Sequence, residues 1–166
     1  MIDVTQALKD TENVLRDLIA EILRKKHGEK WAEKCGVTPD RLEQWTRRKE
    51  EEGKRQEGGA VEERILYYAD FYDLKTILQK NWSDFAPIFG DWKTMEVHLS
   101  ELEKLRDPEA HRRELLPHQK HLILGIAGEI RTRMIRYRSK EETGEDYYLR
   151  IESVREVTEH RPLEFP

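Results

Sequence analysis

The stretch TQALKDTENVLRDLIAEILRKKH, residues Thr5–His27, decides the fold class of this chain. Its apolar side chains recur at helical spacing, at Leu8, Leu15, Leu18, Ile19, Ile22 and Leu23. Such a stripe predicts an amphipathic helix with one buried face. The basic last turn and Gly28 after it are typical of a helix C-terminus.

The next helix signal is the tripeptide Thr38-Pro39-Asp40, which combines a hydroxyl N-cap, proline at the first helical position and an acid in the first turn. We expect a helix from Arg41 to about Glu52, followed by a mobile loop over Gly53–Gly59. Most side chains in this stretch are charged. The sequence therefore predicts a solvated helical excursion over residues 38–60.

Three further helical stretches follow. Dense apolar spacing predicts one helix from Val61, or two helices meeting near Asp70, ending before Asn81. Ser83 is expected to cap a short helical segment, and Thr94 to start another amphipathic helix. The four tryptophans, Trp31, Trp45, Trp82 and Trp92, are expected in the core or at its edge, with base stacking as the secondary interpretation.

A last long helix is predicted from Pro117 or His118 to about Lys140. Its expected buried side chains are Leu122, Ile123, Ile126, Ala127, Ile130, Met134 and Tyr137. Gly125 and Gly128 within it each cost about 1 kcal/mol of helix stability relative to alanine. We attribute them to a close approach between helices. Beyond this helix, apolar and polar residues alternate over 147–152, which predicts an extended tail over residues 143–166.

Composition excludes several classes of protein. The chain has 166 residues, of which 39% are charged and 37% hydrophobic, with nine glycines and six prolines. Its single cysteine, Cys35, can form neither an internal disulfide nor a thiolate zinc site. The longest apolar run, Leu122–Ile130, is too short to span a bilayer. No secretory leader pattern opens the sequence, so the expected location is the cytoplasm. Together these features predict an all-α bundle with no membrane segment.

The chemistry-bearing motif is Arg106-Asp107-Pro108-Glu109-Ala110-His111. Asp107 before a proline suits a helix N-cap, which makes Arg106 the N′ residue and His111 the N4 residue. Residues at N′ and N4 touch across a helix start. Arginine offers a planar fork for phosphate, and histidine can transfer protons near neutral pH. The alternative is a structural corner in which Arg106 is paired with Asp107 or Glu109.

The charge around this motif is biased. Residues 104–140 contain ten Lys or Arg and four acids, whereas the whole chain has a net charge of −4. A basic stretch on an acidic protein attracts polyanions. We therefore expect RNA contacts from Arg112, Arg113, His118, Lys120 and His121. For Arg112 and Arg113 the alternative is a solubilising role, and for His118 and His121 it is capping of a helix start. A metal site from His111, His118 and His121 lacks a carboxylate to orient the imidazoles, so no metal or other cofactor is expected.

The run from Tyr68 through Lys140 resembles a HEPN domain (higher eukaryotes and prokaryotes nucleotide-binding). The resemblance rests on DFYDL at 70–74, ILQKNW at 77–82, Phe85, FG at 89–90 and Leu102-x-x-Leu105-Arg106-Asp107-Pro108-Glu109-Ala110-His111. It is greatest to the subgroup found in a nuclear RNA-surveillance endonuclease and in prokaryotic stress or defence proteins. The family hallmark is Arg, four to six residues, then His. Asparagine is more usual at the position of Asp107.

The resemblance implies a bundle of four or five helices, here residues 1–142, that forms a homodimer and brings two Arg/His motifs into one cleft. It also implies a metal-independent endoribonuclease in which His111 transfers protons, Arg106 stabilises the transition state and Asp107 orients Arg106. The alternative is a non-catalytic module that dimerises or binds RNA or a partner protein. A further alternative is a toxin-type nuclease held silent by an antitoxin.

Overall fold

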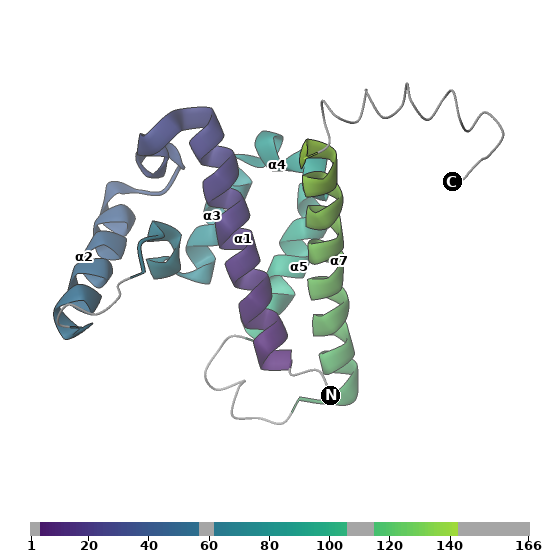
Figure 1. Cartoon of the computed structure of the whole chain (residues 1–166). Helices are drawn as coiled ribbons and strands as arrows, with labels where there is room; N and C mark the ends of the chain where they lie inside the picture. Colours follow the sequence, from purple (N-terminus) through teal and green to yellow (C-terminus); the bar gives the residue numbers. More distant parts are fainter. Residues whose placement is uncertain (1–3, 57–61, 106–114, 143–166) are drawn as a thin grey trace, which may run out of the picture. The chain divides into compact units, whose positions relative to one another are not determined.

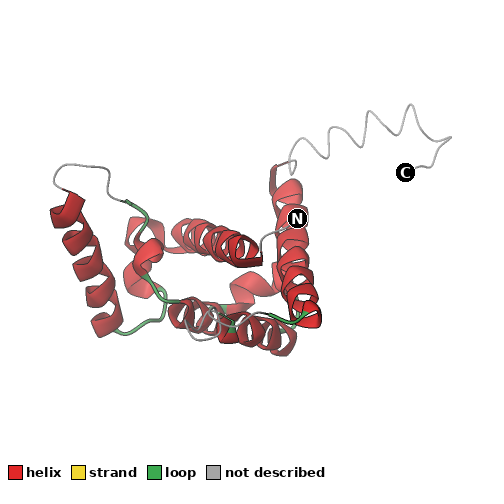
Figure 2. Cartoon of the chain, turned by 90° about the horizontal axis from the view of Figure 1, so that it is seen from below, coloured by secondary structure: helices red, strands yellow, loops and turns green. Residues whose placement is uncertain are grey.

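The computed structural model describes residues 4–56, 62–105 and 115–142, and every regular element within them is helical (Figures 1 and 2). The elements are α1 (Val4–His27), η1 (Gly28–Lys34), α2 (Pro39–Gln56), η2 (Ile65–Tyr68), α3 (Phe71–Lys80), α4 (Trp82–Phe89), α5 (Trp92–Lys104) and α7 (Pro117–Glu142). The prediction of an all-α bundle is confirmed. No helix of the described part has the length and hydrophobicity needed to cross a membrane.

The chain divides into two compact units, Met1–Arg131 and Thr132–Pro166. The first unit contains every helix up to the first half of α7. The described part of the second unit is the remainder of α7. The predicted extended tail, residues 143–166, lies outside the described residues.

α1 confirms the helix expected from its apolar stripe. Leu15, Leu18, Ile19 and Leu23 have no exposed surface. Gly28 follows with φ +81°, the left-handed conformation that lets the chain leave the helix. η1 then continues the chain as far as Lys34.

The core of the first unit collects apolar side chains from every helix. Its largest fully buried side chains are Trp45, Phe71, Phe85, Leu15, Leu18, Ile19, Leu23, Leu66, Leu74, Ile77, Leu78 and Leu99. Trp31 and Trp45 are buried, whereas Trp82 and Trp92 are half-buried and pack edge to face at 5.1 Å between ring centroids. The tryptophans therefore lie in the core or at its edge, as predicted.

α2 differs from the predicted solvated excursion. The Thr38 hydroxyl accepts from the Arg41 amide at 3.3 Å, which confirms the predicted N-cap. The helix then continues through Gly53 to Gln56, so the expected loop does not begin at Gly53. It packs mainly against η1 and η2, at one side of the unit (Figures 1 and 2). Trp45 is fully buried, so the helix is part of the packed unit. Most of its charged residues are exposed, but Arg41 reaches inward to the carboxylate of Asp73.

Two helix starts lie upstream of the predicted capping residues. α4 begins at Trp82 after Asn81, so Ser83 is inside the helix and does not cap it. α5 begins at Trp92, and the carboxylate of Asp91 accepts from the Thr94 amide at 3.2 Å. Thr94 is therefore the residue that is capped. At α4 the N-cap residue Asn81 makes no capping side-chain hydrogen bond, so only α5 has a side-chain cap of the two.

α7 corrects two expectations. Its buried side chains Ile123, Ile126, Ala127, Ile130 and Met134 are as predicted, but Leu122 is 46% exposed. A Cβ built on Gly125 or Gly128 would meet no atom within 4 Å. The predicted close approach between helices is therefore absent at both glycines among the described residues.

Candidate functional site

The predicted catalytic motif lies between two well-defined helix ends. α5 ends at Lys104, and the Leu105 amide donates to the Leu102 carbonyl at 3.2 Å. The predicted residues Arg106, Asp107, His111, Arg112 and Arg113 lie outside the described residues. Leu115 is the next described residue, two positions before α7 begins.

The start of α7 is fixed by a side chain that the sequence analysis did not single out. The Gln119 side-chain oxygen accepts from the Leu116 amide at 2.9 Å. The amides of Gln119 and Lys120 both donate to the Leu116 carbonyl, at 3.0 and 3.1 Å. This geometry makes Leu116 the N-cap and Gln119 the N3 residue, and Gln119 supplies one of the two hydrogen bonds of a capping box. The point where the chain re-enters a helix after the motif is thus anchored.

Two of the three predicted RNA contacts on α7 share one face. His118, Lys120 and His121 are all exposed. At 3.6 residues per turn, His118 and His121 lie about 60° apart around the helix, whereas Lys120 is about 100° from His121 and about 160° from His118. The two imidazoles therefore present a common surface, and the lysine presents another. No group of three metal-ligating side chains occurs in residues 4–56, 62–105 and 115–142.

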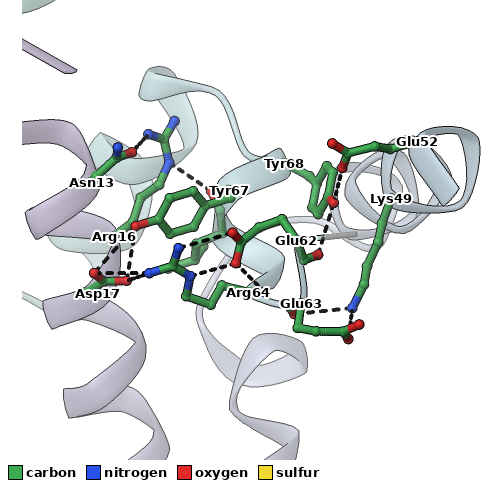
Figure 3. A network of polar contacts seen from close by, with 11 residues as sticks. Asn13, Arg16, Asp17, Lys49, Glu52, Glu62, Glu63, Arg64, Tyr67 and Tyr68 are labelled. Carbon is green, nitrogen blue, oxygen red and sulfur yellow. Dashed lines mark hydrogen bonds and ion pairs between the residues drawn. The ribbon is translucent and has the colours of Figure 1, made fainter. Parts of the chain in front are cut away.

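A polar network between α1, η2 and the segment before η2 is the largest feature that sequence reasoning missed (Figure 3). Two guanidinium groups lie against the Tyr67 ring, with Arg64 at 3.9 Å and Arg16 at 5.6 Å from its centroid. Asp17 accepts from Arg64 at 3.2 Å and from the Tyr67 hydroxyl at 3.3 Å. Arg64 also donates to Glu62 at 2.6 Å. The two contacts of Asp17 join residues that are 47 and 50 positions apart in the chain.

Arg16 holds the backbone of η2 against α1. Its guanidinium donates to the Leu66 carbonyl at 2.9 Å and to the Ala69 carbonyl at 3.1 Å. It also contacts Asn13 at 3.1 Å and Glu12 at 3.4 Å. Arg16 is one of three buried polar residues of α1, with Thr11 and Glu12. A buried arginine that satisfies two carbonyls acts as a structural clamp.

The electrostatics of the network follow from its pairing. The hydrogen bond from Arg64 holds the pKa of Glu62 below its ordinary value, and the same bond raises the pKa of Arg64. Desolvation, with the Asp17 charge second, raises the pKa of Tyr67. Desolvation, followed by the hydrogen bond to Glu52, raises the pKa of Tyr68 to about 12. Both tyrosines therefore stay protonated at neutral pH and serve as donors.

A groove of about 850 Å³ lies beside this network, with walls from α1, η1, α2 and η2. Its lining mixes apolar side chains such as Trp31 and Leu42 with Arg16, Asp17, Arg24 and Glu63. Both basic and acidic groups line it. The groove therefore selects no single charge class of ligand.

A second buried network centres on Asp73, which is 1% exposed. Its carboxylate accepts from the Trp45 indole at 2.9 Å, from Arg41 at 2.8 Å and from the Asp70 amide at 2.9 Å. The bond to Asp73 raises the pKa of Arg41. The sequence signals for this pairing were Trp45, a lone tryptophan in a charged helix, and Asp73, an acid in an apolar run. The network ties α2 to the start of α3.

Neither a protein-family model, nor a curated protein, nor a solved structure matches the chain.

Proposed function

We propose that this chain is a HEPN-like, metal-independent endoribonuclease that works as a homodimer. The observation that carries the proposal is the motif Arg106-x4-His111, set in a basic segment that leads directly into the anchored start of α7. The all-α bundle supports it, because the resemblance implies such a fold. His118 and His121 follow the motif in sequence, and both are exposed polar side chains.

The proposed chemistry uses the 2′-hydroxyl of RNA as the nucleophile. Cleavage needs a base for that hydroxyl, an acid for the departing 5′-oxygen and positive charge at the phosphorus. One chain provides one histidine and one arginine from the motif. A two-fold axis beside the motif doubles both, so His111 of each protomer takes one proton-transfer role, and the two Arg106 side chains stabilise the developing charge. In this scheme Asp107 orients Arg106, and Arg112, Arg113, His118, Lys120 and His121 hold flanking phosphates.

The test is cleavage of single-stranded RNA in the presence of EDTA by the wild-type chain and by His111→Ala. We expect the substitution to lower the rate by about 10²–10⁴-fold, because it removes a proton-transfer group. His98→Ala is the matched control, since it removes an imidazole from α5 outside the basic segment. A substrate with 2′-deoxyribose at the scissile position should not be cut.

Three results would contradict the proposal. They are cleavage that stops only when chelator is added, cleavage that survives His111→Ala, and cleavage of the 2′-deoxy substrate.

The second candidate function, a non-catalytic interaction module, is favoured by the exposure of Leu116 (54%) and Leu122 (46%) near the start of α7. A folded wild-type dimer that binds RNA without cutting it would support that module.

A further inference from the structure

α2 is held on the first unit by little apolar surface. Leu42 and Trp45 are the only large apolar side chains among its 18 residues. Trp45 is fully buried, and Leu42 is half-buried. Because hydrophobic stabilisation grows with the apolar area removed from water, the docking of α2 depends strongly on its polar contacts. α1, by contrast, buries Leu8, Leu15, Leu18, Ile19, Ile22 and Leu23.

Arg41 and Arg48 join α2 to the start of α3. Arg41 pairs with the carboxylates of Asp73 at 2.7 Å and Asp70 at 3.1 Å. Arg48 pairs with Asp70 at 3.3 Å and donates to the Tyr68 carbonyl at 2.7 Å. The side chains of Arg41, Arg48 and Asp70 are 30%, 41% and 51% exposed. Salt therefore screens the pairs with Asp70, because water and ions reach them.

The second half of α2 is attached to η2 and to the segment before it. Lys49 donates to the Glu63 carbonyl at 3.1 Å and pairs with the Glu63 carboxylate at 3.2 Å. The Tyr68 hydroxyl donates to the carboxylate of Glu52. Trp45, Lys49 and Glu52 stand at i, i+4 and i+7, so they lie on one side of the helix. This side combines one buried indole with charged groups.

Contacts within α2 support the helix without help from the rest of the chain. Thr38 caps its first turn. Glu43 and Arg47 form an i,i+4 ion pair at 3.1 Å, and Glu50 and Lys54 stand at the same spacing in the sequence. Glutamate four residues before lysine or arginine stabilises even an isolated helix. Undocking of α2 therefore leaves these contacts in place.

The chain that leads into α2 has an anchor of its own. The Lys80 ammonium donates to the Gly36 carbonyl at 2.7 Å, and the Asn81 side-chain amide donates to the Cys35 carbonyl at 2.7 Å. Both donors lie at the end of α3. Residues 37–38 separate this anchor from α2, so rotation of the backbone there moves α2 without breaking the anchor.

We propose that α2 undocks from the first unit as one helix while the other helices of the unit stay packed, and that the ion pairs of Arg41, Arg48 and Lys49 set how often it does so. Elements with few buried apolar contacts open at a lower free energy than the core. α2 supplies Leu42 and Thr46 to the groove, so each undocking removes one wall of the groove. This undocking is independent of the proposed function, because the catalytic motif takes no part in it.

Hydrogen exchange followed by mass spectrometry measures the opening of each helix in the intact chain. We expect peptides from α2 to exchange faster than peptides from α1 and α5. Raising NaCl from about 0.05 M to about 1 M shortens the Debye length to about 3 Å, and it should raise the exchange of α2 relative to α1 about threefold or more. The α1 peptides of the same sample correct for any effect of salt on the exchange chemistry.

Two arginines of α2 give a matched pair of variants. Arg41→Ala removes the pairs with Asp70 and Asp73, and it should speed the exchange of α2 about tenfold or more, because hydrogen bonds to charged groups are lost. Arg47→Ala removes an exposed pair with Glu43 on the same helix, and it should change the exchange about twofold or less. The exchange of α1 and α5 should stay at the wild-type rate in both variants.

Asp70→Asn tests the charge alone. Asparagine caps a helix as well as aspartate does, so α3 should keep its start. Arg41 and Arg48 nevertheless lose the carboxylate that they share. α2 should then exchange faster than in wild type, and its exchange should respond less to salt. Arg47→Ala should keep the full salt response.

Wild-type α2 that exchanges as slowly as α1 would overturn the proposal, because the helix would then open only together with the whole unit. Exchange confined to the last turn of α2 would also overturn it, because that pattern is fraying. Equal acceleration of α1 and α2 in Arg41→Ala would show that the pairs support the whole fold instead. The same salt response in wild type and Asp70→Asn would show that the ion pairs do not control undocking.

Discussion

The carboxylate of Asp73 holds α2 against the start of α3. It is buried at the first turn of α3, yet it accepts from an indole and a guanidinium that both come from α2. It also accepts from the Asp70 amide, and so closes the capping box that starts α3. A buried charge is tolerated when hydrogen bonds surround it in this way. The same residue therefore sets where α3 begins and where α2 docks.

We predict that Trp45→Phe lowers the free energy of unfolding by about 1–3 kcal/mol. The substitution keeps most of the buried aromatic surface and removes one donor from a buried carboxylate. Urea denaturation measures the difference. Arg47→Ala is the control, because its ion pair with Glu43 on the same helix is exposed and contributes little. Equal stabilities of wild type and Trp45→Phe would show that the indole bond is dispensable.

The raised pKa of Tyr68 predicts a loss of stability at alkaline pH. The pKa is raised from 10.0 to about 12, because desolvation and the Glu52 carboxylate both disfavour the phenolate. The folded state therefore holds a proton that the unfolded chain releases near pH 10. The resulting stabilisation is complete below pH 10 and is lost as the pH rises from 10 to about 12.

The measurement is the free energy of unfolding as a function of pH for wild type and Tyr68→Phe. The wild-type curve should fall more steeply over this range, because phenylalanine has no proton to lose. Absorbance of tyrosinate during an alkaline titration gives an independent reading, and the variant should lose a late-titrating group. Parallel stability curves would contradict the assignment.

At the scale of elements, helix boundaries depend on a few side-chain acceptors. Thr38 caps α2, Asp91 caps α5 and Gln119 holds the first turn of α7. Each satisfies an amide that has no partner inside its own helix. The caps before α5 and α7 matter most for the site, because the motif segment joins these two helices in sequence.

We predict that Asp91→Ala destabilises the protein by about 0.5–2 kcal/mol, since the Thr94 amide loses its acceptor. Asp91→Asn should retain most of the stability, because an asparagine side chain caps equally well. Thermal unfolding followed by circular dichroism compares the two variants. The cap would have no role if alanine and asparagine behaved alike.

For the whole molecule, the distribution of charge decides how it would bind the RNA of the proposed function. The net charge of the chain is −4, yet residues 104–140 are strongly basic. Phosphates are therefore attracted to one part of the chain and repelled by the rest. Binding through counterion release weakens as salt rises, and the slope counts the phosphates that are neutralised.

We predict that the double variant Arg112→Ala/Arg113→Ala reduces the salt slope of single-stranded RNA binding by about 1.4, or about 0.7 for each lost contact. Fluorescence anisotropy at several salt concentrations gives the slope. Lys9→Ala on α1 is the control, because it is exposed and lies outside the basic segment. A slope that drops equally in the control would show that both arginines act only through overall charge.

The sequence by itself determined the helical class and most helix positions, because apolar spacing and caps are local properties that α1 and the buried residues of α7 confirm. It also supplied the motif Arg106-x4-His111 and the basic segment around it as hypotheses. Only the tertiary structure decided that α2 packs through Trp45 and Asp73, and that no atom of the described residues lies over Gly125 or Gly128. The physical reason is distance along the chain. Spacing within a few residues fixes a helix and its apolar face. Which acid binds a given indole, and whether a glycine has a neighbour, is decided only when segments far apart in sequence pack together.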